Sequence, residues 1–125
     1  MPIRMTQQTK LVLATVKKFG HATNSTILIY ADKKMPGLSA TTVHRITNRL
    51  ITNGFLSRGP YINNSTVIDA NIKPHDHFVC YKCGGVKDIY LPVSIRKSLQ
   101  KQVPGFEGST QLTISGDCVK CLNHS

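Results

Sequence analysis

The chain lacks several features that whole classes of protein require. It has no apolar run long enough to cross a membrane, and its first ten residues, MPIRMTQQTK, lack the apolar core of a signal peptide. It also has no internal repeat and no low-complexity tract. We therefore expect a soluble, cytoplasmic protein with no membrane partner.

Acidic side chains are scarce. The sequence has 6 Asp and Glu against 16 Lys and Arg, a formal net charge of +10. Residues 1–70 carry +7 of it and residues 71–125 only +3. A positive field concentrated in one part of a chain is typical of proteins that bind a polyanion such as DNA, although many basic faces are merely solvated.

The four cysteines form two Cys-x-x-Cys pairs, Cys80/Cys83 and Cys118/Cys121. With 125 residues the chain makes one ordinary domain or two small ones, and a domain below about 80 residues usually needs a metal or a disulfide. Two-residue spacing lets both thiolates of one turn reach a single tetrahedral centre. Disulfides are the alternative, which a reducing compartment disfavours. We predict one structural Zn2+ held by all four thiolates.

The first half has the pattern of three helices followed by a hairpin. Apolar spacing predicts helices over residues 6–18, 23–34 and 39–53, and strands over 55–58 and 66–69 joined by a turn-rich tip at 59–65. In a basic segment this is the order of a winged helix-turn-helix. Residues 39–53 would be its recognition helix and residues 59–65 its wing.

The third predicted helix has one apolar and one polar face. Ser39 is a suitable N-cap, and Val43, Ile46 and Leu50 fall on the same side. A polar face of Thr, His, Arg and Asn suits a major-groove reader, although a solvated amphipathic helix has the same pattern. The candidate DNA contacts are Ser39, Thr41, Thr42, His44, Arg45, Asn48 and Arg49.

The character of the sequence changes near residues 71–74. Strand patterns flank the CYKCGG turn, a short helix is predicted over residues 93–102, and residues 108–116 alternate like a strand. The predicted fold class is α+β: a winged helix-turn-helix over residues 1–70, then a small α/β domain over residues 75–125 with a four-cysteine zinc site.

Two histidines precede the first cysteine pair. His75 and His77 alternate on an extended segment, so both imidazoles point to one side and Asp76 to the other. Asp69, six residues before His75, is placed to close on the same point. A His-x-His pair is often only surface polarity, so the pair by itself leaves a metal site and a polar surface both open. Periodicity does not place His21 or Asp88.

The chain as a whole resembles the ferric uptake regulator family. The resemblance is carried by MTQQTKLVLATV, GHATNSTILIY, LSATTVHRITNRL, VIDANIKPHDHFVCYKCGGVKDI, VPGFEGSTQLTISG and CVKC. It implies a homodimeric, metal-dependent transcriptional repressor that binds a double-stranded DNA operator. It also implies a hinge at residues 71–74, a C-terminal dimerisation domain, and neither an enzyme activity nor a small-molecule substrate.

The resemblance assigns roles to two groups of ligands. The four cysteines match the structural zinc ligands of the family. The regulatory ligands implied are His21, Asp69, His75, His77 and Asp88. Such O and N donors suit Fe2+ or Mn2+, and ligands drawn from both domains would let the metal favour one orientation of the DNA-binding domains.

Within the family the sequence is most similar to the peroxide-sensing repressors, because Asp88 stands where iron regulators usually carry Glu. In that branch Fe2+ reacts with peroxide and oxidises ligand histidines, which would be His21 and His75. The alternative is an iron, manganese or zinc uptake regulator. The family's auxiliary metal site is incomplete, since Asp76 is present but its expected partners fall on Ile95 and Thr110.

Two features depart from the family. The segment before Thr6 is short, so we expect the usual leading helix to be reduced or missing. His44 stands where a Tyr is common, so the operator is expected to differ. Two hypotheses from other classes are a zinc enzyme, for which Asp76 is the only spare acid, and a structural zinc ribbon that binds RNA, which predicts no second metal and no dimer.

Overall fold

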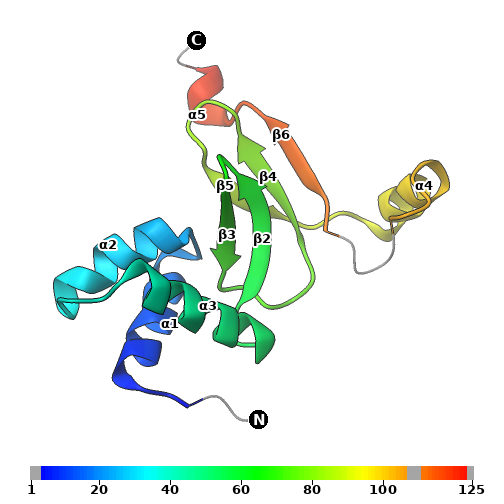
Figure 1. Ribbon diagram of the computed structural model, residues 1–125. Coiled ribbons are helices and arrows are strands. Elements are labelled where there is room, and N and C mark those ends of the chain that lie inside the picture. Colours follow the sequence, from blue (N-terminus) through cyan, green and yellow to red (C-terminus); the bar gives the residue numbers. More distant parts are fainter. Residues whose placement is uncertain (1–3, 107–110, 124–125) are drawn as a thin grey trace. The chain divides into compact units, whose positions relative to one another are not determined.

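The structure, a computed structural model, describes residues 4–106 and 111–123. The chain divides into two compact units, Met1–Ile72 and Lys73–Ser125 (Figure 1). No helix among the described residues is long and apolar enough to cross a membrane.

The N-terminal unit contains the three predicted helices, α1 Gln7–Phe19, α2 Asn24–Lys34 and α3 Ala40–Thr52. Each begins after a hydroxyl residue, Thr6, Thr23 or Ser39, whose side-chain oxygen accepts the backbone N–H three residues later. Such caps satisfy one of the four amide donors that a helix leaves without a partner at its start. The helix predictions are confirmed.

The same unit contains an antiparallel sheet of order β1-β3-β2, formed by β1 His21–Ala22, β2 Ser57–Ile62 and β3 Ser65–Asp69. Only Asn63 and Asn64 form the tip, and their φ values of 51° and 64° are those of a tight primed turn. The hairpin is confirmed, but its tip has two residues rather than seven. Strand β1 was not predicted, because two residues are too short to show alternation.

Apolar faces of the three helices pack together to form the N-terminal core. Val12, Val16, Ile27, Val43 and Leu50 are all 0% exposed. The apolar stripe predicted for α3 is therefore the side that holds this helix in the unit, which leaves its polar side toward solvent. Burying each such side chain contributes roughly 1.5–3 kcal/mol.

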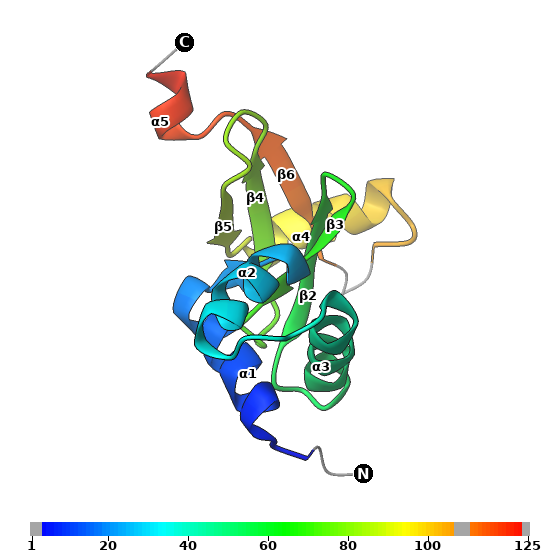
Figure 2. The same ribbon diagram turned by 60° about the vertical axis from the view of Figure 1, so that its left-hand side comes forward.

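The C-terminal unit has a three-stranded sheet of order β5-β4-β6 (Figure 2), formed by β4 Asp76–Cys80, β5 Val86–Ile89 and β6 Thr113–Gly116. Strand β4 runs antiparallel to β5 and parallel to β6. The parallel pair needs a crossover, and helix α4 Val93–Gln102 lies within it. The predicted helix over 93–102 is confirmed.

The last predicted strand is shorter than the alternating pattern. It spans Thr113–Gly116, and residues 108–110 of the pattern lie outside the described residues. A one-turn helix, α5 Val119–Leu122, follows it and carries the last cysteine. Four residues are too few for helical periodicity, so the sequence did not predict α5.

Candidate metal centres and recognition surface

The four cysteines converge in the C-terminal unit. Their Sγ atoms all lie within 4.8 Å of one another, and the Sγ atoms of Cys83 and Cys118 are 3.8 Å apart. A tetrahedral zinc with Zn–S bonds of about 2.3 Å has sulfur–sulfur edges of about 3.8 Å. The turn after β4 supplies one pair, and the segment from Cys118 to α5 supplies the other. The geometry fits the predicted Zn2+.

The thiols of this cluster differ in acidity. Backbone N–H groups of Cys83 and Cys118 lower the pKa of the Cys80 thiol to about 6. Hydrogen bonds to Cys118 and then to Cys80 raise the pKa of the Cys121 thiol to about 12. At neutral pH Cys80 is therefore a thiolate and Cys121 keeps its proton. Zinc binding must release that proton, so zinc affinity rises with pH.

A second cluster of candidate ligands lies at strands β4 and β5 of the C-terminal unit. The Nε2 atoms of His75 and His77 are 3.1 and 3.5 Å from Asp88 Oδ1, and the two rings are 4.5 Å apart. The register of β4 against β5 places His77 opposite Asp88. Both histidines are buried, with His77 0% exposed. The prediction that the two imidazoles point to one side is confirmed, and Asp88 joins them through strand pairing.

A backbone hydrogen bond orients the His75 ring so that its Nε2 faces Asp88. Its Nδ1 lies 2.6 Å from the backbone carbonyl oxygen of Lys73, so Nδ1 carries the hydrogen and donates it there. In the neutral ring Nε2 then bears a lone pair, directed toward the Asp88 carboxylate 3.1 Å away. Two electron-rich atoms at this distance attract a cation between them. A backbone carbonyl that fixes the tautomer in this way is common behind metal-binding histidines.

The other two predicted regulatory ligands form a pair within the N-terminal unit. His21 on β1 and Asp69 on β3 are register partners, with His21 Nε2 3.3 Å from Asp69 Oδ2. Asp69 is 1% exposed, and its Oδ1 accepts the backbone N–H of Asn71. Pairing of β1, which was not predicted, with β3 brings His21 to Asp69. A buried carboxylate requires cations or donors nearby, and the His21 ring is one such neighbour.

Asp76 points away from this second cluster, as the alternation predicted, and it has a partner that the sequence analysis missed. Its two carboxylate oxygens lie 3.0 and 2.8 Å from one guanidinium nitrogen of Arg96 on α4, and Oδ1 accepts the backbone N–H of Leu112. The Arg96 guanidinium lies 4.7 Å from the centre of the Phe106 ring. The side chain of Asp76 therefore connects three segments of the C-terminal unit.

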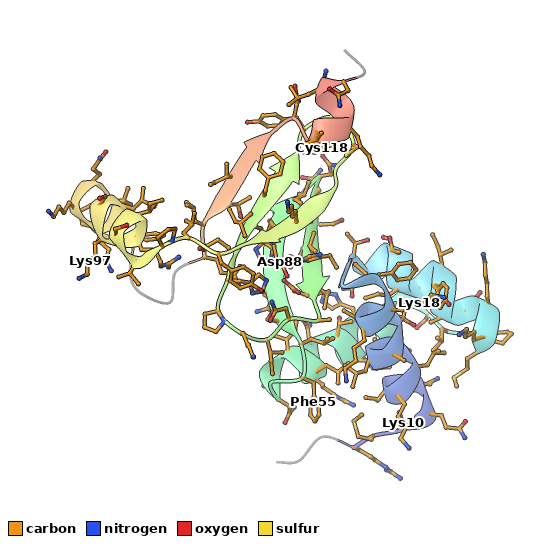
Figure 3. All side chains as sticks on the ribbon, turned by 180° about the vertical axis from the view of Figure 1, so that it is seen from behind. Lys10, Lys18, Phe55, Asp88, Lys97 and Cys118 are labelled. Atoms are coloured by element: carbon orange, nitrogen blue, oxygen red, sulfur yellow. The ribbon has the colours of Figure 1, made fainter. Side chains whose placement is uncertain are left out.

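The two ligand clusters are separate sites. Figure 3 shows that Asp88 of the His/Asp cluster and Cys118 of the cysteine cluster lie well apart on the C-terminal unit.

The candidate DNA contacts differ in accessibility. Thr41, His44, Arg45 and Arg49 are exposed, whereas Thr42 and Asn48 are partly buried. Ser39 uses its hydroxyl oxygen to cap α3, accepting the Thr42 N–H at 3.1 Å. The amide oxygen of Asn48 lies 3.4 Å from the guanidinium of Arg58 on β2, which links α3 to the base of the wing.

Comparison with known proteins decides the family. The family model described as the ferric uptake regulator family matches residues 1–114. The chain belongs to the ferric uptake regulator family. It is 28% identical over 122 residues to the peroxide operon regulator of Bacillus subtilis (strain 168), covering 95% of this chain and 84% of that protein.

Two solved structures are also similar. The peroxide stress regulator of Campylobacter jejuni is 27% identical with a TM-score of 0.70, covering 91% of this chain and 88% of that one. The ferric uptake regulator of Francisella tularensis, solved with iron, has a TM-score of 0.79 at 20% identity, covering 98% and 96%. The latter shows the shared fold.

Ferric uptake regulators are dimeric, metal-responsive proteins that bind DNA. Our chain is therefore a transcription regulator and not an enzyme, and its fold is the α+β fold predicted for it. This membership sets aside the zinc-enzyme and zinc-ribbon hypotheses.

Proposed function

We propose that the protein is a cytoplasmic repressor whose DNA binding requires Fe2+ or Mn2+ and which is inactivated by hydrogen peroxide. Residues 1–70 bind the operator, 71–74 form a hinge and 75–125 dimerise. The observation that carries the proposal is the convergence of His75, His77 and Asp88, with Nε2 of His75 3.1 Å and Nε2 of His77 3.5 Å from the Asp88 carboxylate.

In this proposal the cysteine cluster holds Zn2+ permanently and a second ion carries the signal. All-thiolate sites are closed and stabilise a fold, whereas imidazole and carboxylate donors suit Fe2+ and Mn2+. His21 and Asp69 complete the regulatory set of His75, His77 and Asp88. Ligands contributed by both units make the metal a constraint on the hinge, so that loading favours the DNA-binding arrangement.

Exposed apolar side chains support a dimer formed by the C-terminal unit. Helix α4 has no buried residue among those described, and Val93 and Ile95 on it are 67% and 45% exposed. Strand β6 lies at an edge of the sheet and exposes Ile114 at 40%. An open edge strand and exposed apolar side chains are each suited to contact with a second copy.

The peroxide signal is supported by the relatives and by the donor set. The B. subtilis relative is named a peroxide operon regulator. Bound Fe2+ would supply the electrons that reduce peroxide, and this chain supplies histidines beside it as targets. The test is mass spectrometry of the Fe2+-loaded protein after peroxide treatment, with the Mn2+-loaded protein as the control.

We expect a one-oxygen adduct on His21 or His75 in the Fe2+ form, accompanied by loss of DNA binding, and no adduct in the Mn2+ form. Intact histidines together with unchanged metal-dependent DNA binding would instead support an iron, manganese or zinc uptake regulator.

Removal of a regulatory ligand should abolish the metal response without removing zinc. His77→Ala deletes a donor whose ring lies beside His75 and Asp88, so DNA affinity measured with Mn2+ should fall to the metal-free level, a loss of at least tenfold. The measurement is fluorescence anisotropy with operator DNA, alongside zinc analysis. Asp88→Asn serves as a second, nearly isosteric variant.

Lys87→Ala is the matched control, because Lys87 neighbours Asp88 on β5 but points to solvent. It should retain the full Mn2+ response. Wild-type DNA affinity in both ligand variants would remove His77 and Asp88 from the regulatory site.

A further inference from the structure

We propose that Asn24 is a positioning residue that fixes His44 as a hydrogen-bond donor to a base in the major groove, most favourably guanine. The proposal rests on the proposed function, since it needs α3 to be the recognition helix. Nothing in the sequence pattern linked Asn24, in the first turn of α2, to the polar face of α3.

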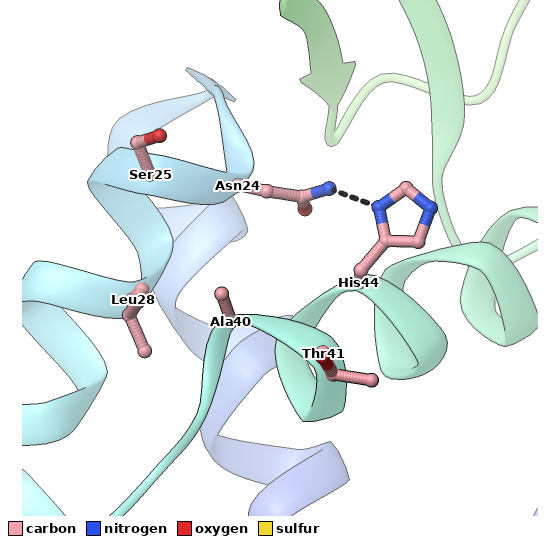
Figure 4. Close-up of a pocket in the computed structure, with 6 residues that line it drawn as sticks. All are labelled: Asn24, Ser25, Leu28, Ala40, Thr41 and His44. Atoms are coloured by element: carbon pink, nitrogen blue, oxygen red, sulfur yellow. Dashed lines mark hydrogen bonds between the residues drawn. The ribbon is translucent and has the colours of Figure 1, made fainter.

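The two residues meet at a groove between α2 and α3 (Figure 4). Its volume is about 370 Å³, and it is lined by Asn24, Ser25, Leu28, Ala40, Thr41 and His44. The Nδ2 atom of Asn24 lies 3.1 Å from Nδ1 of His44. This contact joins α2 to His44, the side chain on α3 that would contact a base.

The orientation of the Asn24 amide is set from its other side. Thr47, 0% exposed on α3, has a hydroxyl whose single hydrogen is shared between two acceptors, Asn24 Oδ1 at 2.9 Å and the His44 backbone carbonyl oxygen at 3.1 Å. The Nδ2 end of the amide therefore faces His44, and an NH2 group only donates. Through this shared hydrogen, Thr47 connects the Asn24 amide to the backbone of His44.

The tautomer of His44 follows from this contact. Because Nδ1 accepts from Asn24, the neutral ring carries its hydrogen on Nε2, and His44 is exposed on the outer face of α3. In the major groove a donor finds two acceptors, N7 and O6, on guanine, one acceptor each on adenine (N7) and thymine (O4), and only another donor on cytosine. A ring held in this way selects against cytosine and prefers guanine.

The first measurement is the protonation of His44 itself. Long-range 15N–1H NMR spectra of the zinc-loaded full-length protein should show the neutral ring protonated at Nε2 in the wild type and a mixture of tautomers in Asn24→Ala. A merely structural role of Asn24 would not change the tautomer. A proton on Nδ1 in the wild type would mean that the amide is reversed and would overturn the proposal.

The second measurement is sequence preference. Mn2+-loaded wild-type protein selects binding sites from double-stranded DNA with a randomised 30-base-pair window, and each variant is then measured on the selected site and its single-base changes. Asn24→Ala and His44→Ala should each lose about fivefold to tenfold discrimination at the same symmetric base pairs. The double variant should lose no more than His44→Ala alone.

Ser25→Ala is the matched control, since Ser25 lines the same groove and should keep the wild-type preference. Losses at different base pairs, additive losses, or an unchanged preference in Asn24→Ala would refute the role of Asn24. Failure of the proposed function has a different signature. In that case the wild type selects no sequence, and Arg45→Ala leaves DNA affinity unchanged.

Discussion

Replacing Cys80 or Cys118 with serine is expected to unfold the C-terminal unit. The four Sγ atoms lie within 4.8 Å of one another, so loss of one thiolate opens the zinc coordination shell. Zinc binding by such sites contributes about 10–16 kcal/mol in zinc-finger peptides. A whole small domain is stable by only about 5–15 kcal/mol. Zinc content should therefore fall from one ion per chain to none, and the dimer should dissociate.

The measurements are zinc analysis, circular dichroism and light scattering of the purified variants. Serine is almost the size of cysteine, so a steric effect at Cys80, which is 1% exposed, is small. Lys82→Ser is the control, because Lys82 lies within the same turn and is exposed. A folded, dimeric Cys80→Ser protein would contradict a structural role for the cluster.

The sequence predicted what depends on local spacing. Two Cys-x-x-Cys turns are enough to identify a four-thiolate cluster, because each pair already lies within one turn. The polar and apolar faces of α3 could also be predicted, since 3.6-residue periodicity determines which side chains share a face. These predictions needed no knowledge of how distant segments pair.

The remaining site residues depend on strand register, which local spacing does not determine. Asp88 meets His77 because β5 pairs with β4, and His21 meets Asp69 because β1 pairs with β3. Resemblance to a family supplied these four residues as ligands, while periodicity left two of them unplaced. The link from Asn24 to His44 depends on how α2 packs against α3, and neither the pattern nor the resemblance contained it.

For Asp76, the strand alternation predicted the direction of the side chain but not its partner. The alternation with His75 and His77 correctly placed its side chain on the opposite side of the strand, where its acid appeared to be a remnant of an incomplete metal site. A carboxylate that is 3% exposed must have a positively charged or donor partner. That partner is Arg96, twenty residues away, and its position on α4 follows from tertiary packing.

The second large effect is therefore expected from Arg96→Met. The substitution keeps an unbranched apolar stem but removes the guanidinium from both Asp76 oxygens, leaving a buried carboxylate that still accepts the Leu112 N–H. Removing one partner of a buried ion pair lowers the free energy of unfolding by about 3–5 kcal/mol. Urea unfolding of the zinc-loaded protein should show this loss in the transition of the C-terminal unit.

A double variant separates the charge from the packing. Asp76→Asn combined with Arg96→Met removes the unpaired charge while the amide oxygen still accepts the Leu112 N–H, so it should recover most of the lost stability. Lys97→Met, which also replaces a basic side chain with Met but at an exposed position one residue along α4, should alter stability by less than about 0.5 kcal/mol. If Arg96→Met and Lys97→Met behave alike, Arg96 does not stabilise the position of α4. If the double variant is no more stable than Arg96→Met, the contribution of Arg96 comes from its packing against Phe106 rather than from Asp76.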